Sequence, residues 1–280
     1  MPQLISSAIR RLRKLWTSAR AYFKFLVRSI EVGANHGVIA QDFAIDGGRV
    51  RVWYRYSSKG DKGVIEQIFD DREYGVERWR HGKALRCFYA ASTAAGKTPL
   101  IVDAGANIGA SCAYFLHVYP LSHVVAVEPE RNNCELLRLN CKGRSVDIVE
   151  GALGLWREPM YVSDPGLSDW GFRVEKSGSY RVQVIAPDAL VARYGDARFQ
   201  PFLFKADIEG SEAQLFDGAV EWLDGFALVV LELHDWMLPG RRISRGFLQA
   251  ITKFDFDVLH NGENVFCFNN RLLRGYYREH

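Results

Sequence analysis

The sequence predicts an α/β protein: a doubly wound sheet of seven strands, six parallel and the last antiparallel, preceded by an N-terminal helical extension. Three observations support this fold class. From residue 100 onward, short apolar runs alternate with segments of helical periodicity. The last two runs are separated by only five residues, too few for a crossover between parallel strands. The first 32 residues carry an uninterrupted helical pattern.

Each apolar run of the second half predicts a buried strand. The runs are 100–102, 124–127, 146–149, 202–204, 226–231, 256–259 and 265–268. Helices are expected between most of them, for example at 109–118, 132–140 and 212–223. The last two runs predict an antiparallel hairpin. Residues 155–185 interrupt the alternation with a strand-like insertion.

Residues 1–32 predict a basic amphipathic helix. Apolar side chains recur there at three- and four-residue steps, and neither proline nor glycine occurs between Gln3 and Val32. Seven of the 36 basic residues, and none of the 33 acidic ones, lie within residues 1–30. Two interpretations are open. The helix packs on the rest of the protein or on a second subunit, or it lies on a membrane with its basic face on anionic lipid.

Residues 33–98 predict a hairpin followed by a helical cap. Alternating β-branched and aromatic residues over 38–57 flank a turn at Asp46-Gly47-Gly48. Residues 62–95 have helical periodicity, which stops at Gly96 just before the first strand of the sheet. A tail is expected at 271–280.

Composition excludes several classes of protein. With 48% hydrophobic and 13% aromatic residues, the chain is globular rather than disordered. Five cysteines without metal-ligand spacing predict a reducing compartment, hence a cytoplasmic protein that residues 1–30 could hold at the inner membrane face. Because the basic excess is confined to those residues, no nucleic acid partner is expected. No apolar run approaches the roughly 20 residues of a membrane-spanning helix.

The first strand of the predicted sheet ends in a glycine loop. Gly105 permits a sharp turn and a close approach to a ligand, and Gly109 lets the next helix begin against the sheet. A dinucleotide-binding loop would read G-x-G-x-x-G, whereas these glycines are four residues apart with Asn107 between them. The loop therefore suits a nucleoside cofactor without phosphates. Asp103 agrees, because a carboxylate repels phosphate but attracts an ammonium group.

The second strand ends in Glu128-Pro129, 19 residues after Gly109. A carboxylate at this strand end can accept hydrogen bonds from both hydroxyls of a ribose, each contributing about 1.5–3 kcal/mol before desolvation. Glu128 is therefore the predicted ribose ligand.

Two further strands end in ionisable residues. Asp207 and Glu209 follow the run at 202–204, and His234 follows the run at 226–231. Because the carboxyl ends of parallel strands face one crevice, these side chains are expected to form a polar reaction centre. His234 could equally be a structural histidine with its hydrogen bonds satisfied.

Together these segments resemble the FkbM-type methyltransferases, S-adenosylmethionine-dependent enzymes with a seven-stranded Rossmann-like sheet. The resemblance covers about residues 64–270. It is carried by Asp103-x-Gly105-Ala106-Asn107-x-Gly109, Glu128-Pro129, Gly151-Ala152-Leu153-Gly154, Asp188-x-Leu190, Lys205-x-Asp207-Ile208-Glu209-Gly210-x-Glu212, Gly218-Ala219 and Glu232-x-His234.

The resemblance implies O-methylation, typically of a hydroxyl on a sugar, glycan or natural product. It implies that Glu128 binds the ribose of the cofactor, that Ala152 lies near the adenine, and that Asp207 faces both cofactor and acceptor. The residues implied to hold the methionine part are Asp103, Gly105, Ala106, Asn107 and Gly109.

Two further domains are expected. Residues 33–98 should form a cap on the substrate side, and residues 99–270, with the insertion at 155–185, should form the methyltransferase domain. The walls of an acceptor pocket are expected from aromatic residues of the cap and the insertion. These are Tyr74, Trp79, Trp156, Trp170 and Phe172.

Methyl transfer to a sugar hydroxyl needs a base, because the hydroxyl is a weak nucleophile. Asp207 is the first candidate and His234 the second, with Glu209 positioning the acceptor. No dedicated metal-binding set is expected, although a carboxylate pair would suit magnesium or calcium. Two other functions stay open: a non-catalytic binding module that keeps the fold, and a nicotinamide-dependent oxidoreductase, which the missing third glycine disfavours.

Overall fold

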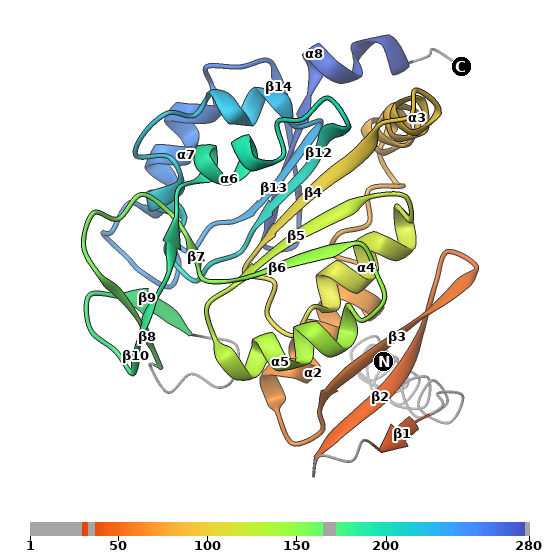
Figure 1. Ribbon diagram of the computed structural model, residues 1–280. Coiled ribbons are helices and arrows are strands. Elements are labelled where there is room, and N and C mark those ends of the chain that lie inside the picture. The colour runs from red at the N-terminus through yellow and green to blue at the C-terminus, as the bar shows by residue number, and fades with distance from the viewer. Residues whose placement is uncertain (1–29, 33–36, 165–171, 278–280) are drawn as a thin grey trace, which may run out of the picture.

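The computed structural model describes residues 30–32, 37–164 and 172–277. At its centre is one large sheet (Figure 1). Its strands are β4 (Thr98–Ala104), β5 (His123–Glu128), β6 (Val146–Glu150), β12 (Phe199–Ala206), β13 (Leu228–Glu232), β14 (Phe256–Asn261) and β15 (Asn264–Asn269). The spatial order is β14-β15-β13-β12-β4-β5-β6. All seven predicted runs thus form strands of a single sheet.

The sheet is parallel except for β15, which runs antiparallel to both of its neighbours, β13 and β14. The predicted sheet with one antiparallel strand is therefore confirmed. The short connection holds β15 beside β14, and β15 fills the space between β14 and β13. The last strand in the sequence consequently lies inside the sheet and not at its edge.

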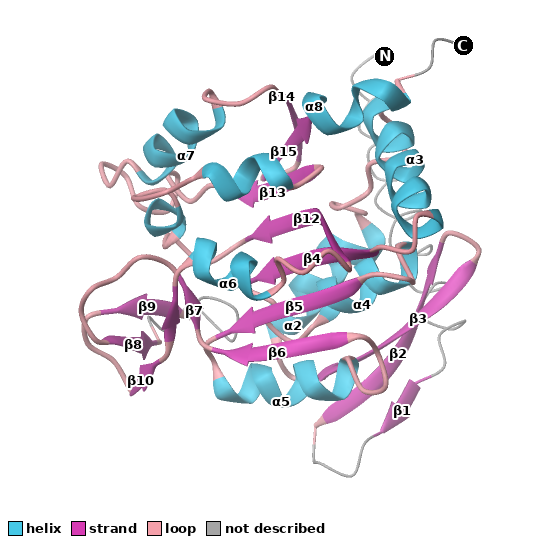
Figure 2. Ribbon diagram, turned by 45° about the horizontal axis from the view of Figure 1, so that its top comes forward, coloured by secondary structure: helices cyan, strands magenta, loops and turns pink. Residues whose placement is uncertain are grey.

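Helices cover both faces of the sheet (Figure 2). Successive side chains of a strand point to opposite faces, so neighbouring residues enter different cores. Ile101 belongs to a core that includes residues of α3 (Arg80–Ala94), α4 (Ala110–Val118) and α5 (Arg131–Asn140). Leu100 and Val102 belong to another core, which includes residues of α6 (Pro187–Arg193) and α7 (Ile243–Ile251). This is the doubly wound arrangement that the alternating pattern predicts.

Two of the helical predictions are wrong in detail. Residues 212–223 form two short 3₁₀-helices, η2 (Glu212–Leu215) and η3 (Glu221–Gly225), and Gly218, a poor helix former, lies between them. In the cap, α2 (Lys59–Ile65) continues into one π-helical turn, η1 (Glu66–Asp70), and the chain leaves the helix before α3 begins. Arg72 adopts a left-handed φ of +54° in that break, a conformation that ends helices.

The predicted N-terminal helix falls almost entirely outside the described residues. Residues 30–32, however, form a strand, β1 (Ile30–Val32), which pairs antiparallel with β2 (Val38–Ile45). The helix predicted to reach residue 32 is therefore wrong over its last three residues, because pairing with a neighbouring strand overrides the helical pattern there.

The hairpin of β2 and β3 (Gly48–Arg55) turns where predicted. Asp46 and Gly47 both have positive φ, +44° and +79°, as a two-residue turn between twisted strands requires. The side-chain amide of Asn140, at the end of α5, bonds both backbone groups of Trp53, at 2.7 and 2.9 Å. The hairpin is thereby fastened to the helices beside the glycine loop.

The insertion forms a small antiparallel sheet of β8 (Met160–Ser163), β9 (Arg173–Glu175) and β10 (Tyr180–Val182). Its ends are joined by a parallel pair, β7 (Ala152–Leu153) with β11 (Val184–Ile185). The expected C-terminal tail begins with two short helices, α8 (Asn270–Leu273) and η4 (Arg274–Tyr276). Within the described ranges, no helix combines the length and apolarity needed to cross a bilayer.

Candidate active site

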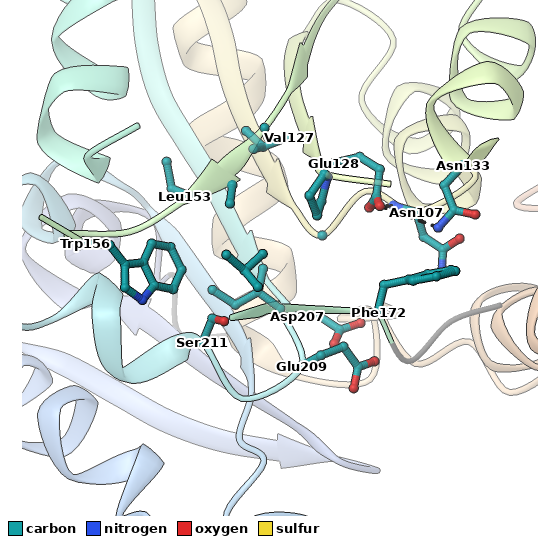
Figure 3. Close-up of a pocket in the computed structure, with 16 residues that line it drawn as sticks. Asn107, Val127, Glu128, Asn133, Leu153, Trp156, Phe172, Asp207, Glu209 and Ser211 are labelled. Atoms are coloured by element: carbon teal, nitrogen blue, oxygen red, sulfur yellow. Dashed lines mark hydrogen bonds between the residues drawn. The ribbon is translucent and has the colours of Figure 1, made fainter. Parts of the chain in front are cut away.

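A cleft of about 570 Å³, partly open to solvent, lies beyond the carboxyl ends of the central strands (Figure 3). The glycine loop after β4, the end of β5, the β6–β7 connection and the loop after β12 all contribute to it. This is where an open parallel sheet binds its ligand, because the chain reverses its winding direction there.

The glycine loop packs tightly against its neighbours. Gly105 and Gly109 have positive φ values of +75° and +83°, which favour glycine. A Cβ on Gly105 would overlap the carbonyl oxygen of Asp207, and one on Gly109 would press on Leu137 of α5. The close contact at Gly105 is therefore with the protein backbone, and the tight helix start at Gly109 is against α5.

Glu128 lies at the floor of the cleft and is 5% exposed. Its Oε2 accepts a hydrogen bond from the amide of Asn107 at 2.8 Å, and its Oε1 accepts one from the amide of Glu130 at 2.9 Å. Burial raises the pKa of Glu128 to about 7, although these amides and Asn133 oppose the shift. Oε1 also accepts from the side-chain amide of Asn133 at 3.5 Å, so Oε2 is the oxygen that keeps a lone pair for a further donor.

Asp103 lies beneath the loop, fully buried. Its Oδ2 accepts hydrogen bonds from Ser111 and Cys112, and its Oδ1 is 3.2 Å from the ammonium group of Lys205. Burial opposes the charge of Lys205, but Asp103 outweighs it, so the pKa of the lysine lies above its ordinary value. Lys205 also donates to the carbonyl of Gly105 at 2.7 Å. The pair thus supports the loop from inside the protein.

The predicted cofactor residues therefore fall into two groups. Asp103, Ala106 and Gly109 are buried below the surface of the cleft and do not line it. The predicted residues that line it are Gly105, Asn107, Glu128, Ala152 and Asp207.

Part of the lining of the cleft is apolar and aromatic. Trp156 and Leu153 line one side of the cleft, and Phe172 lines the other side near Asn107 (Figure 3). Tyr74 and Trp79 do not contribute. Tyr74 packs against Tyr114 and Phe115, and Trp79 packs against Phe266 and Phe268, because these side chains fill one of the two cores. These residues were predicted to wall the acceptor pocket. Tyr74 and Trp79 line neither this cleft nor the one adjoining it, Trp156 and Phe172 line this one, and Trp170 lies outside the described residues.

Asn133 and Ser211, which the sequence did not single out, also line the cleft. Asn133 follows the predicted ribose ligand by five residues on α5, and Ser211 lies inside the segment that follows β12. Neither position belongs to a recognisable chemical pattern, so only the fold brings them to the cleft.

A second cleft, of about 980 Å³ and also open to solvent, adjoins the first. Residues of α2 and η1 form one wall, and Glu232 and Trp236 form part of the other. Three residues line both clefts: Asn107, Asp207 and Glu209. The carboxylates of Asp207 and Glu209 therefore lie at the junction of the two spaces.

His234 is 2% exposed and surrounded by carboxylates. Its Nδ1 is 2.8 Å from Oε1 of Glu212, which is fully buried and also accepts from the amides of Ile208 and Gly210. Its Nε2 faces Glu232 at 3.4 Å. Burial alone would lower the pKa of His234, but the interactions with Glu212 and Glu232 outweigh it and raise the pKa to about 11.

The acids around His234 are less readily ionised than ordinary carboxyls. Burial, with the charge of Asp207, raises the pKa of Glu209 to about 8. Burial also raises the pKa of Glu232. Glu209 holds a left-handed φ of +55°, which turns its side chain toward the junction of the clefts. The predicted catalytic residues Asp207, Glu209 and His234 are therefore neighbours.

The sheet order, the glycine loop and the buried carboxylate at the end of β5 together define an α/β methyltransferase. The chain belongs to the Methyltransferase FkbM domain family, whose model matches residues 103–258. Methyltransferases of this kind generally use S-adenosylmethionine. No curated protein matches the sequence.

Solved structures of low similarity share parts of the fold. A methyltransferase from Geobacter sulfurreducens is 16% identical, with 74% of this chain and 87% of that chain covered and a TM-score of 0.34. The Methanococcus jannaschii fibrillarin pre-rRNA processing protein is 10% identical, with 86% and 96% covered and a TM-score of 0.41. A putative caffeoyl-CoA O-methyltransferase from Staphylococcus aureus is 11% identical, with 73% and 90% covered and a TM-score of 0.37. Likeness at this level carries no information about the reaction.

The residues of the first cleft fit S-adenosylmethionine. Glu128 keeps a lone pair on Oε2 for a ribose hydroxyl, and the diol shares Oε1 with the amides of Glu130 and Asn133. The acidic side chains there, Glu128, Asp207 and Glu209, would repel a phosphate but tolerate a sulfonium and an ammonium group. The apolar wall around Leu153 and Trp156 suits a purine ring.

Proposed function

We propose that this protein is an S-adenosylmethionine-dependent O-methyltransferase that acts on a hydroxyl of a sugar, glycan or related metabolite. The observation that supports it most is the shared lining of the two clefts by Asp207 and Glu209. A carboxylate at the junction lies between the space that suits the cofactor and the space left for an acceptor.

In this proposal Glu128 accepts hydrogen bonds from the ribose diol, and the glycine loop binds the methionine part of the cofactor. The bound cofactor supplies an electrophilic methyl group. Asp207 would accept the hydroxyl proton as the acceptor oxygen bonds to the methyl carbon and the carbon–sulfur bond breaks, with the neutral thioether leaving; this proton transfer contributes about 10²–10⁴-fold. Glu209 orients the acceptor, and the walls of the second cleft hold it in line.

The second cleft supports a polyhydroxylated acceptor. Its lining combines hydrogen-bonding side chains, among them Gln67 and Glu66, with Trp236, which is 62% exposed. Aromatic faces beside polar groups suit the two faces of a sugar ring. Lys59 is the one basic residue among the described residues that line it, beside six acidic ones, so the cleft offers little to an anionic acceptor.

The test uses the purified full chain, labelled S-adenosylmethionine and a panel of neutral glycans. We expect binding of S-adenosylhomocysteine at micromolar concentrations and label incorporation that Asp207→Ala abolishes. Retention of the biological function by Asp207→Ala would favour a non-catalytic binding module. Co-purified nicotinamide cofactor would favour the oxidoreductase alternative. Absence of S-adenosylhomocysteine binding by calorimetry would refute the proposal.

For residues 1–30 we propose contact with a membrane surface or with a second copy of the chain, on the basis of their basic, amphipathic sequence. Deleting residues 1–29 leaves β1 in place. Loss of binding to anionic but not zwitterionic vesicles would identify the cytoplasmic membrane face as the partner. A lower mass in solution, with vesicle binding unaffected, would identify self-association.

A further inference from the structure

Three side chains at the ends of β12 and β13 bring one possible metal-ligand atom each close together. They are Asp207, Glu232 and His234, and their donor atoms all lie within 4.8 Å of one another. In the described part of the chain, no other set of three or more histidine, cysteine, aspartate or glutamate side chains meets this condition. The donors come from neighbouring strands of a rigid sheet, so their separation is set by the fold.

The imidazole gives this group its chemical character. Its Nδ1 is held by the buried Glu212, whereas its Nε2 makes no comparable bond. The oxygens nearest to Nε2 belong to Glu232 at 3.4 Å and to Asp207 and Glu209 at 3.8 Å each. Such distances are long for hydrogen bonds. A ring nitrogen in a side chain that is 2% exposed thus points into the carboxylates without a close partner.

The distances from Nε2 to these oxygens are close to those between two atoms that ligate the same ion. Ligands bound at about 2.0–2.2 Å in tetrahedral or octahedral geometry lie roughly 3–3.5 Å apart at neighbouring positions. The separation of 3.4 Å between Glu232 and Nε2 falls in this range, and 3.8 Å for Asp207 needs only a small movement of a side chain that is 29% exposed. Glu212 supplies the outer carboxylate that usually fixes a ligating histidine.

The acidic side chains around this group also favour the binding of a cation. Glu209 stands beside the group. Lys205 lies 3.8 Å from Asp207 but is engaged more closely by Asp103 and the carbonyl of Gly105. The second cleft gives solvent and solutes access to Asp207 and Glu232. An ion could therefore enter and would replace the proton on Nε2.

We propose that Asp207, Glu232 and His234 bind a divalent cation at the junction of the two clefts. Two carboxylate oxygens with one imidazole nitrogen, and no sulfur, suit an ion of the manganese type. The role that we give the ion rests on the proposed function: it holds the acceptor oxygen and acidifies its hydroxyl. Asp207 is then a ligand, and the hydroxyl proton passes to Glu209 as the methyl group is transferred.

The test measures binding of Mn²⁺ alone to chelator-treated full-length protein, by calorimetry and by the electron paramagnetic resonance of the bound ion. We expect one site, and a dissociation constant at least about tenfold weaker in Glu232→Gln and His234→Gln. The matched control is His81→Gln, because His81 pairs with Asp257 at 2.8 Å at a distance from the clefts. This variant should bind Mn²⁺ as the unaltered protein does.

The outcomes separate this inference from the proposed function. S-adenosylhomocysteine binding by each variant shows that it is folded, and Glu232, which is 14% exposed, can become glutamine with little disturbance. No saturable Mn²⁺ binding, or equal binding by Glu232→Gln, would overturn the metal site. Methyl transfer at full rate after chelation would overturn the ion's role and leave Asp207 as the base. Mn²⁺ binding without any S-adenosylhomocysteine binding would instead overturn the methyltransferase proposal.

Discussion

The backbones of Gly105 and Asp207 are in direct contact. The amide of Asp207 donates to the carbonyl of Ala104 at 3.1 Å, and the space where a side chain of residue 105 would begin is filled by the carbonyl oxygen of Asp207. The loop that suits the cofactor and the loop that carries the candidate base are therefore one unit. Movement of either loop moves the other.

The first prediction concerns this contact. Gly105→Ala should lower the free energy of unfolding by about 3 kcal/mol, because left-handed strain and a backbone overlap add. Gly96 has the same φ of +75° but open space around its Cα, so Gly96→Ala should cost only about 1 kcal/mol. Urea unfolding measures both. Equal losses for the two variants would show that the overlap is relieved at no cost.

The second prediction concerns the ribose ligand. Glu128→Gln should weaken binding of S-adenosylhomocysteine by at least about tenfold, because a charged acceptor for the diol is replaced by a neutral amide. Glu135→Gln on the exposed face of α5 is the control and should leave the affinity unchanged. Titration calorimetry gives both values. Full affinity in Glu128→Gln would place the ribose elsewhere.

The third prediction is a pH dependence of cofactor binding. Burial raises the pKa of Glu128 to about 7, and a diol that donates two hydrogen bonds prefers the ionised form. The affinity for S-adenosylhomocysteine should therefore rise with pH and be about tenfold weaker at pH 6 than on the plateau above pH 8. In Glu128→Gln this step should vanish. A step of the same size in that variant would assign it to another group.

Ionisation of Glu128 also affects the free energy of unfolding, which should fall with rising pH while the affinity for the cofactor rises. Between about pH 4.5, the ordinary value for glutamate, and pH 7, folded Glu128 keeps a proton that the unfolded chain has lost. The stabilising contribution is thus complete below that window, and the free energy of unfolding falls as pH rises through it. We expect Glu128→Gln to lack this component when chemical denaturation is followed at a series of pH values.

The fourth prediction concerns the buried pair beneath the loop. Lys205→Met should cost about 3–5 kcal/mol, because it leaves the fully buried Asp103 without its counter-charge. Adding Asp103→Asn should recover part of the loss. The exposed pair of Lys176 and Glu158 is the control, and Lys176→Met should change stability by less than about 0.5 kcal/mol. Additive losses in the Lys205 and Asp103 variants would contradict a direct interaction.

Much of the fold is predictable because its signals are local. The apolar runs of the five inner strands are buried on both faces, so their composition identifies them, whereas the edge strands β6 and β14 are partly exposed. The turn at Asp46-Gly47 and the loop at Gly105 depend on φ values that few other residues tolerate. The helix predictions were wrong where periodicity competes with tertiary packing, as at 212–223 and at 30–32.

The candidate site was likewise predictable where its signals are local and not where they depend on tertiary contacts. Glu128 and Asp207 could be chosen from the sequence, because an acid at the end of a parallel strand faces the ligand crevice in any such sheet. The sequence by itself thus determined the sheet, its binding edge and the acids placed along that edge. Only the tertiary structure decided that Asp103 pairs with Lys205, that Glu212 holds His234, and that Tyr74 enters the core. Those partners lie on different strands and helices, and contacts between them depend on sheet order and twist, which no local pattern encodes.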